Sequence, residues 1–225
     1  MFQISDNWKI VYPDAHVGML VMRDAANPPH HAELEKRKIA LEDELRARYA
    51  HQDRAALMQL TVLQAYAAYY RRFKKTYHVQ LQLESIVFKD KSLPSVAALV
   101  EAMFMAEVKN LLLTAGHDLD LLHLPLALDV AQGDERYSLL RGQEQELKAG
   151  DMFIRDGRGV ISSIVYGPDQ RTAINAQTRQ VVFTIYAPAG IAEETLLNHL
   201  HDLQENVLLV APAAQVGLLQ AFGAR

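Results

Sequence analysis

The most constraining feature of the sequence is a change of character at Gly116. Before it, long segments place apolar residues at helical spacing. After it, short strand-like runs follow one another, separated by glycine-containing turns. These runs cover residues 125–131, 136–140, 151–155, 160–166 and 180–186. With a closing amphipathic helix predicted at 192–209, the layout of helices, then a β unit, then a helix indicates the α+β class.

The part before Gly116 contains one predicted strand and several predicted helices. The strand is a short apolar run, and the last of the helices is apolar on nearly every side, so we expect that helix to be central. One segment alternates in a way that fits either a strand or an extended entry into a short helix. The elements are a strand at 16–22, helices at 31–49 and 96–113, one helix or a pair at 54–77, and the ambiguous segment at 79–88.

The chain length of 225 residues suits one domain, and half of the residues are hydrophobic, so a sizeable core can be buried. We predict a single domain over 1–225. Within it we expect a strand-and-helix extension at 1–54, a core at 55–209 and a tail at 210–225.

Composition excludes several classes of protein and site. There is no cysteine, which excludes disulfides and thiolate metal sites and fits a reducing compartment, so we expect a cytoplasmic protein. We also predict that the protein has no cofactor. The net charge of −4 argues against a surface that is basic overall. Residues 1–6 lack the features of a signal peptide, and charges interrupt residues 96–113, so we expect no membrane association. The sequence leaves the oligomeric state open.

Two stripes run along residues 54–77 and just beyond. Tyr66, Tyr70, Phe73 and Tyr77 fall on one helical face, and Arg71, Lys74, Lys75 and His78 fall on another. The favoured interpretation is an aromatic face toward the core and a solvated basic face. The alternative is a nucleic-acid surface in which the cations contact phosphates. Its contact residues would be Arg71, Arg72, Lys74 and Lys75.

A polar loop between two strand-like runs, within residues 162–187, is the predicted site. Gly167-Pro168-Asp169 is a turn signal, and polar groups on a loop held by a rigid scaffold commonly build sites. Arg171 is the strongest candidate, because a guanidinium can clamp a carboxylate or a phosphate through two hydrogen bonds. The alternative is a surface arginine or an internal salt bridge that stiffens the loop. The other pocket candidates are Ser163, Tyr166, Thr172 and Thr178.

Two further groups of ionisable residues invite a chemical interpretation. His117, Asp118 and His123 are of metal-ligating types, but their spacing matches no compact metal motif, so we predict no metal and treat His117 and Asp118 as pocket residues. Glu101 lies in the apolar helix and needs a partner if it is buried. We expect it to be a structural ion-pair member rather than a pocket acid.

An ordered series of motifs resembles one family, the editing module (domains B3 and B4) of the phenylalanyl-tRNA synthetase β subunit, and more closely the stand-alone bacterial relatives of that module. The resemblance covers roughly residues 55–209. The motifs are Leu93-Pro94-Ser95, Gly116-His117-Asp118-Leu119-Asp120, Leu139-Leu140-Arg141-Gly142-Gln143-Glu144, Gly150-Asp151-Met152-Phe153-Ile154-Arg155-Asp156, Gln170-Arg171-Thr172 and Thr178-Arg179-Gln180-Val181.

The resemblance implies a three-layer fold with a β-sandwich-like core and flanking helices. It also implies a pocket that hydrolyses wrongly charged aminoacyl-tRNA as a second sieve. The chain departs from the family pattern, however. Ala115 and Gln170 stand where the synthetase modules carry a histidine and a glutamate, and Ala97 and Phe104 stand where they carry asparagines.

Two functions therefore stay open. In the first, a stand-alone editing-like domain binds an amino acid or the aminoacyl end of a tRNA and hydrolyses mischarged aminoacyl-tRNA in trans. In the second, a non-catalytic RNA-binding or amino-acid-sensing module keeps a degenerate editing site. The sequence identifies neither the amino acid nor the tRNA, and it leaves open whether the domain is an enzyme.

Overall fold

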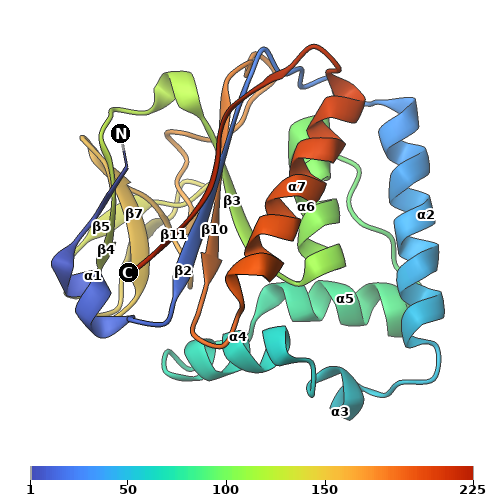
Figure 1. The fold of residues 1–225 in the computed structure, drawn as a ribbon, viewed down its shortest axis with the longest axis horizontal. Helices are drawn as coiled ribbons and strands as arrows, with labels where there is room; N and C mark the ends of the chain where they lie inside the picture. The colour runs from blue at the N-terminus through green and yellow to red at the C-terminus, as the bar shows by residue number, and fades with distance from the viewer. Residues whose placement is uncertain (1, 225) are drawn as a thin grey trace.

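The computed structural model describes residues 2–224 and arranges them in three layers: a five-stranded sheet, a four-stranded sheet and a layer of helices (Figure 1). The predicted α+β class, with a sandwich-like core and flanking helices, is confirmed. The helices are α1 (Asp6–Val11), α2 (Ala32–Tyr49), α3 (Arg54–Leu57), α4 (Thr61–Arg71), α5 (His78–Lys89), α6 (Ala98–Asn110), α7 (Glu193–Val210) and a 3₁₀ turn, η1 (Leu119–Leu121). The strands are β1 (Phe2–Ile4), β2 (His16–Arg23), β3 (Leu113–Asp118), β4 (Leu126–Val130), β5 (Arg136–Ser138), β6 (Glu144–Glu146), β7 (Met152–Asp156), β8 (Gly159–Ser163), β9 (Gly167–Pro168), β10 (Val181–Ala187) and β11 (Gln215–Gly223).

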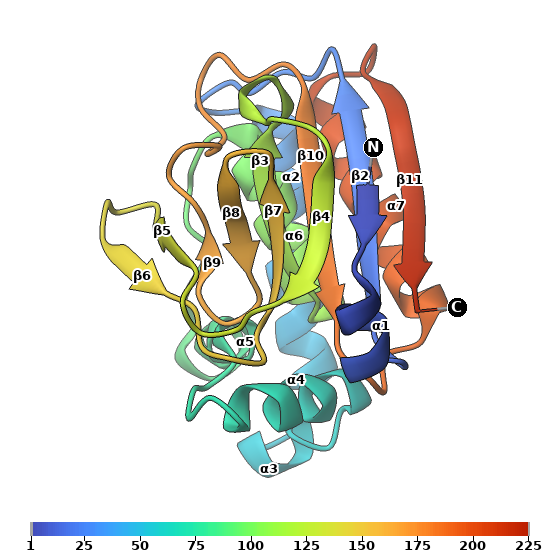
Figure 2. The same ribbon diagram turned by 90° about the vertical axis from the view of Figure 1, so that its left-hand side faces the viewer.

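The two large sheets pack face to face, and Figure 2 shows the five-stranded sheet in front of the four-stranded one. Their strand orders are β1-β4-β7-β8-β9 and β11-β2-β10-β3, while β5 and β6 form a separate hairpin. The four-stranded sheet takes strands from all three segments predicted from the sequence, because β2 lies in 1–54 and β11 lies in 210–225. Every residue of β10 is buried, as expected for a strand covered on both faces.

The helical layer covers the outer face of the four-stranded sheet. Helix α7 contacts β2 and β11, α6 contacts β3, and α2 packs on the far side of α6 and α7 (Figure 1). Helices α4 and α5 close one end of the sandwich (Figure 2). The junction of α6, β3 and the closing loops is therefore enclosed on several sides.

Two local predictions need correction, and one open alternative is decided. The segment 79–88 is helical, in α5, because the buried side chains of Val79, Leu83 and Ile86 repeat at helical spacing, whereas Leu81 is exposed. The segment 54–77, predicted as one helix or a pair, forms the pair α3 and α4. The helix predicted over 96–113 is shorter, because Leu111 adopts a left-handed φ of 61° that ends α6, and the next residues start β3.

The aromatic stripe faces the core, as the favoured interpretation expected. Tyr66, Tyr70, Phe73 and Tyr77 are all buried, and the rings of Tyr66 and Tyr77 stack with centroids 4.0 Å apart. Their hydroxyls bond main-chain groups: Tyr66 accepts from the Leu113 N–H at 2.9 Å, and Tyr77 donates to the Leu111 carbonyl at 3.0 Å. These rings cannot stack on nucleobases, because they are buried in the core.

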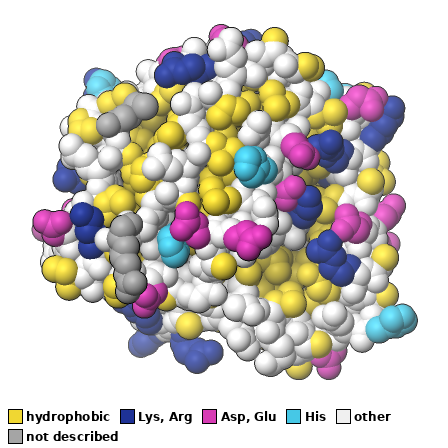
Figure 3. Space-filling model, in the orientation of Figure 1, with side chains coloured by type: hydrophobic (Ala, Val, Ile, Leu, Met, Phe, Trp, Pro, Cys, Tyr) yellow, Lys and Arg dark blue, Asp and Glu magenta, His cyan; other side chains and the backbone are white. Residues whose placement is uncertain are grey.

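Helix α2 combines a charged outer face with a buried ion pair. On its outer face Lys36 pairs with Glu33 and Arg48 with Glu44, and cationic and acidic side chains alternate along this edge in Figure 3. On its inner face Lys38 contacts Glu101 of α6, and both side chains are only 2% exposed. Glu101 is therefore a structural ion-pair member, as predicted.

Within residues 2–224, no helix has the length and apolar character needed to cross a bilayer.

Candidate functional site

A cavity of about 200 Å³, the central cavity, lies between α6, β3 and the segment that joins β8 to β10. Most of its lining is apolar, with Met103 and Phe104 from α6 and Ile174 from the β9–β10 loop. Its polar lining groups are Glu107 from α6, Thr114 from β3, Ser163 from β8, Tyr186 from β10 and, at the start of α5, His78. An apolar pocket with a few converging polar groups is the usual form of a small-molecule site.

Gly116 lets the β9–β10 loop lie directly on β3 at the cavity wall. A Cβ atom at this position would stand 2.7 Å from the Ile174 Cδ1 and 3.2 Å from the Phe183 ring. Any larger residue would have to displace Ile174, which itself lines the cavity. The glycine therefore helps to set the cavity shape.

Glu107 is the ionisable carboxyl that lines the central cavity. It is 2% exposed, and its Oε1 accepts a hydrogen bond from the Thr114 N–H at 2.8 Å. Within residues 2–224, no lysine, arginine or histidine nitrogen lies within 4.0 Å of this carboxylate. Burial raises the pKa of Glu107 to about 8, against the smaller opposing effect of the Thr114 hydrogen bond. A carboxyl with such a pKa changes charge near neutral pH.

The hydroxyl groups beside the cavity are held in fixed positions. The Tyr186 hydroxyl lies 2.7 Å from the Ser162 Oγ, and the Ser163 Oγ accepts from the Tyr166 N–H at 3.1 Å. The Thr114 Oγ1 lies 2.8 Å from the buried Nε2 of His199. Because these partners restrict rotation, the cavity wall is pre-organised.

Predicted pocket residues of the β9–β10 loop instead fasten that loop to β3. The His117 Nδ1 lies 2.7 Å from the Thr172 Oγ1, and Thr172 also donates to Asp169. Thr178 donates to Asp118 at 2.6 Å. All five side chains are buried, and burial, reinforced by Arg171, lowers the pKa of His117 to about 3. The structure brings His117 together with Thr172 and Asp118 with Thr178, but it places all four outside the cavity lining.

Arg171 forms the internal salt bridge that was the alternative to a ligand clamp. Its two terminal nitrogens each lie 2.9 Å from an oxygen of Asp156, and its Nε lies 3.6 Å from Asp169. Asp156 is buried, which raises its pKa, but hydrogen bonds from Arg171 and from the His123 N–H outweigh burial, and the net pKa is lowered. The guanidinium therefore already holds a carboxylate from the β7–β8 turn.

Of the remaining predicted pocket residues, Ser163 lines the cavity and Tyr166 does not. Tyr166 is half-buried beside the Lys75 ammonium group, which lies 5.6 Å from its ring centroid. Across residues 2–224, no group of three or more His, Asp or Glu side chains is arranged to hold a metal ion. His123 contributes main-chain groups: its N–H donates to Asp156, and its carbonyl accepts from the Gly157 N–H at 2.6 Å.

The sequence analysis missed Glu107, although a signal was present. Glu101 and Glu107 both interrupt the apolar helix, and only Glu101 was considered. A separation of six residues places the two side chains on different faces of the helix. Glu101 points to Lys38 of α2, and Glu107 points to β3 and the cavity.

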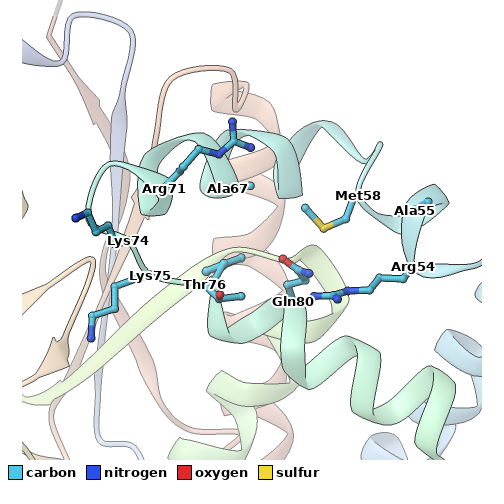
Figure 4. A pocket seen from close by; sticks show the side chains of 10 residues that line it. Arg54, Ala55, Met58, Ala67, Arg71, Lys74, Lys75, Thr76 and Gln80 are labelled. Atoms are coloured by element: carbon cyan, nitrogen blue, oxygen red, sulfur yellow. The ribbon is translucent and has the colours of Figure 1, made fainter.

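A second, more open hollow of about 740 Å³, the basic groove, lies between α4 and α5. Figure 4 shows Arg71 at the end of α4, Lys74 and Lys75 in the turn that follows, and Arg54 at the opposite end. Arg54 pairs with Glu84 at 2.9 Å, whereas Arg71, Lys74 and Lys75 have no acidic partner within 4.0 Å among residues 2–224.

The basic residues do not continue a helical stripe, because α4 ends at Arg71 and Lys74 has a left-handed φ of 57°. The turn nevertheless gathers them around one groove. Arg72, predicted as a fourth contact, instead lies 5.4 Å from the ring centroids of both Tyr12 and Tyr69. Its guanidinium is thus held by aromatic side chains.

The comparisons with known proteins agree with this architecture. The fold is a two-sheet sandwich covered by helices, with a small cavity where α6 meets β3. A family model described as the B3/4 domain matches residues 61–203. This match covers more than half of the chain, and the chain belongs to the B3/4 domain family.

A solved structure shares the fold. It is an N-terminal fragment of the phenylalanyl-tRNA synthetase β subunit from Pyrococcus horikoshii, with a TM-score of 0.50 and 10% sequence identity. The match covers 96% of this chain and 50% of that fragment, so the chain spans about half of the fragment's length. At this identity the likeness concerns the fold alone. No curated protein sequence matches the chain.

Proposed function

We propose that the central cavity binds the aminoacyl end of a tRNA, or an amino acid, and that the domain hydrolyses wrongly charged aminoacyl-tRNA in trans. The observation that carries this proposal is the central cavity with the buried Glu107 carboxyl, which has no cationic partner among the described residues, in its wall. Its volume of about 200 Å³ is below the usual range of about 300–1,000 Å³ for drug-sized ligands. It therefore suits one amino-acid unit rather than a nucleotide.

Hydrolysis would require a water molecule held against the ester carbonyl carbon. The water oxygen attacks this carbon, the ester bond to the terminal ribose breaks, and the products are an amino acid and a free ribose hydroxyl. The Ser163 hydroxyl lines the cavity and can donate a hydrogen bond to an oxygen that becomes negative. Glu107 can accept the proton of the water or hold the amino group of the substrate. Both roles need its carboxylate form, so activity should rise as the pH increases through about 8, the pKa of Glu107.

A specific observation favours the second candidate function, a binding module without catalysis. Ala115 lines the cavity at the position where the resemblance expects a histidine. Gln170, at the position of the expected glutamate, is exposed and lies outside the lining. If hydrolysis depends on that histidine and that glutamate, this cavity can bind a ligand but cannot catalyse its hydrolysis.

A deacylation assay tests the proposal directly. Purified protein is mixed with a panel of correctly and wrongly charged tRNAs, and release of each amino acid is followed over time. We expect one mischarged tRNA to be deacylated, and Glu107→Gln to slow its deacylation by about 100-fold, the typical contribution of a positioned acid or base.

Glu194→Gln is the matched control for this assay, because it makes the same chemical change on the exposed surface of α7. Arg171→Ala tests whether loss of the Asp156 salt bridge disturbs the cavity from a distance. Binding of a charged tRNA without release of any amino acid would replace the editing proposal with the binding module.

The basic groove is the surface that we propose for contact with the tRNA. Arg71, Lys74 and Lys75 lack acidic partners, and Thr76 and Tyr77 of the groove directly precede His78 of the cavity. The groove therefore adjoins the cavity along the chain. A polynucleotide whose phosphates lie on these cations could place its aminoacyl end at the cavity.

We expect Arg71→Ala, Lys74→Ala and Lys75→Ala, combined in one protein, to flatten the salt dependence of tRNA binding. Each lost phosphate contact should reduce the slope of log K against log salt by roughly 0.7 to 0.9. Fluorescence anisotropy with labelled tRNA at several salt concentrations measures the slope. The matched control is Arg48→Ala on α2, where the arginine is already paired with Glu44. An unchanged slope in the triple variant would remove the groove from the tRNA interface.

A further inference from the structure

Among the described residues, Glu107 lacks a cationic partner, whereas Glu101, the other glutamate of α6, has one. Glu101 meets Lys38, whereas the Glu107 carboxyl receives one main-chain hydrogen bond, from Thr114. A buried carboxylate is costly unless a charge or several hydrogen bonds compensate for its lost hydration. The free cavity beside Glu107 is therefore suited to a ligand that supplies the missing positive charge.

The groups around Glu107 do not supply that charge. Helix α4 and the turn after it contribute the hydroxyls of Tyr66, Tyr70 and Tyr77, which donate to the main-chain carbonyls of Tyr186, Ile164 and Leu111. Burial raises the pKa of each of these phenols, and the charge of Glu107 adds to the effect, so they stay neutral. From β10 comes another neutral phenol, Tyr186, and from α5 the imidazole of His78 lies in the lining.

Within residues 2–224, the cavity also lacks a lysine or arginine cation to pair with a negatively charged ligand. Arg171, predicted to hold a carboxylate, is bound by Asp156 and lies outside the lining. A free amino acid would thus bring an unpaired carboxylate into an apolar cavity that already contains an acidic group.

We propose that the central cavity binds the α-ammonium group of its ligand against the Glu107 carboxylate, and that it selects aminoacyl esters and amides over free amino acids. This inference rests on the proposed function and chooses between the two ligands named there. It assigns Glu107 to substrate positioning. The selectivity follows from charge: the ammonium group is common to both ligands, whereas only the free amino acid carries a carboxylate.

The probes for the test are the amides of alanine, valine, phenylalanine and tyrosine, because amides have the same charge as esters and resist hydrolysis. Each is compared with its free amino acid and its N-acetyl amide by calorimetric titration of the full chain at millimolar concentration. We expect at least one amide to bind, and its free acid and N-acetyl form to bind at least about tenfold more weakly. A tenfold change is what a charge-assisted hydrogen bond typically contributes.

A second readout is the number of protons released on binding, which a change in the shape of the cavity alone would not alter. With a pKa of about 8, Glu107 is protonated at about pH 6.5, as is the α-amino group of the amide. Forming the ammonium–carboxylate pair then releases nearly one proton, which titrations in buffers of different ionisation enthalpy detect. Glu107→Gln has no proton to release at this pH, and we expect it to bind the amide at least about tenfold more weakly, with its thermal unfolding checked in parallel.

The inference is overturned if the N-acetyl amide or the free amino acid binds as tightly as the amide, if Glu107→Gln binds with unchanged affinity, or if no amide binds. Its failure is distinguishable from that of the proposed function. Selective amide binding without deacylation would keep this inference and reject catalysis. Deacylation combined with equal binding of amide and N-acetyl amide would keep the enzyme and reject this role for Glu107.

Discussion

Replacing Lys38 with methionine is expected to destabilise the domain by about 3–5 kcal/mol, the usual cost of removing one partner of a buried ion pair. Lys38 is 2% exposed, and its ammonium group contacts Glu101, Glu35 at 2.7 Å and the Ser95 Oγ at 3.0 Å. Methionine fills a similar volume, so the cost arises from the Glu101 carboxylate that stays buried without a cation. Urea unfolding measured by circular dichroism gives the change in free energy.

Two further variants separate charge from packing in this experiment. Glu101→Leu added to Lys38→Met removes both charges, and we expect it to recover most of the lost stability. Lys36→Met on the exposed face of the same helix breaks only the surface pair with Glu33, and we expect it to change stability by less than about 0.5 kcal/mol. Equal losses of stability in Lys38→Met and Lys36→Met would show that the buried pair contributes no more than the surface pair.

The order and type of most elements could be predicted because they rest on local periodicity. The closing helix at 192–209 and the strand at 16–22 match α7 and β2 within two residues. Helix α5 and strand β3 were harder, because their patterns depend on tertiary context. Burial on α5 depends on which of its apolar residues meets α6, and β3 continues the apolar run of α6 after a left-handed turn that no glycine marks.

The candidate site was less predictable, because its properties depend on pairing between distant residues. The predicted loop residues are polar, as loop residues commonly are, but Arg171 meets Asp156 across the β7–β8 turn, and His117 meets Thr172 across the sheet edge. Because of these pairings, the side chains of Arg171 and His117 are not available to bind a ligand, although the sequence analysis predicted that they would be. Conversely, Glu107 is available to a ligand because no cation of the described chain is paired with it. The sequence of one helix does not show which distant side chains pack against that helix, so the lack of a cation could not be predicted.

The largest pH-dependent effect is expected from Glu107→Gln, which should stabilise the domain in alkaline solution. The pKa of Glu107 is about 8 in the folded protein and 4.5 for a fully hydrated glutamate, so between these pH values the folded state binds more protons than the unfolded state. Stability then falls as pH rises, by about 1.4 kcal/mol for each unit of pKa difference. Below about pH 4.5 the carboxyl is protonated in both states, and above about pH 8 the full cost is present.

Glutamine has nearly the same shape, can still accept from the Thr114 N–H and carries no charge at any pH, so it escapes this cost. We expect the variant to exceed the parent protein in unfolding free energy by a few kcal/mol at about pH 9, and the difference to shrink toward zero at about pH 4.5. Other buried groups, such as Asp151 with its pKa raised to about 7 by burial, titrate in both proteins and cancel in the difference. Urea unfolding across this pH range measures the difference, with Glu194→Gln as the exposed control. A difference that does not change with pH would mean that Glu107 keeps an ordinary pKa, and the cavity would then lack the poised carboxyl on which its proposed chemistry depends.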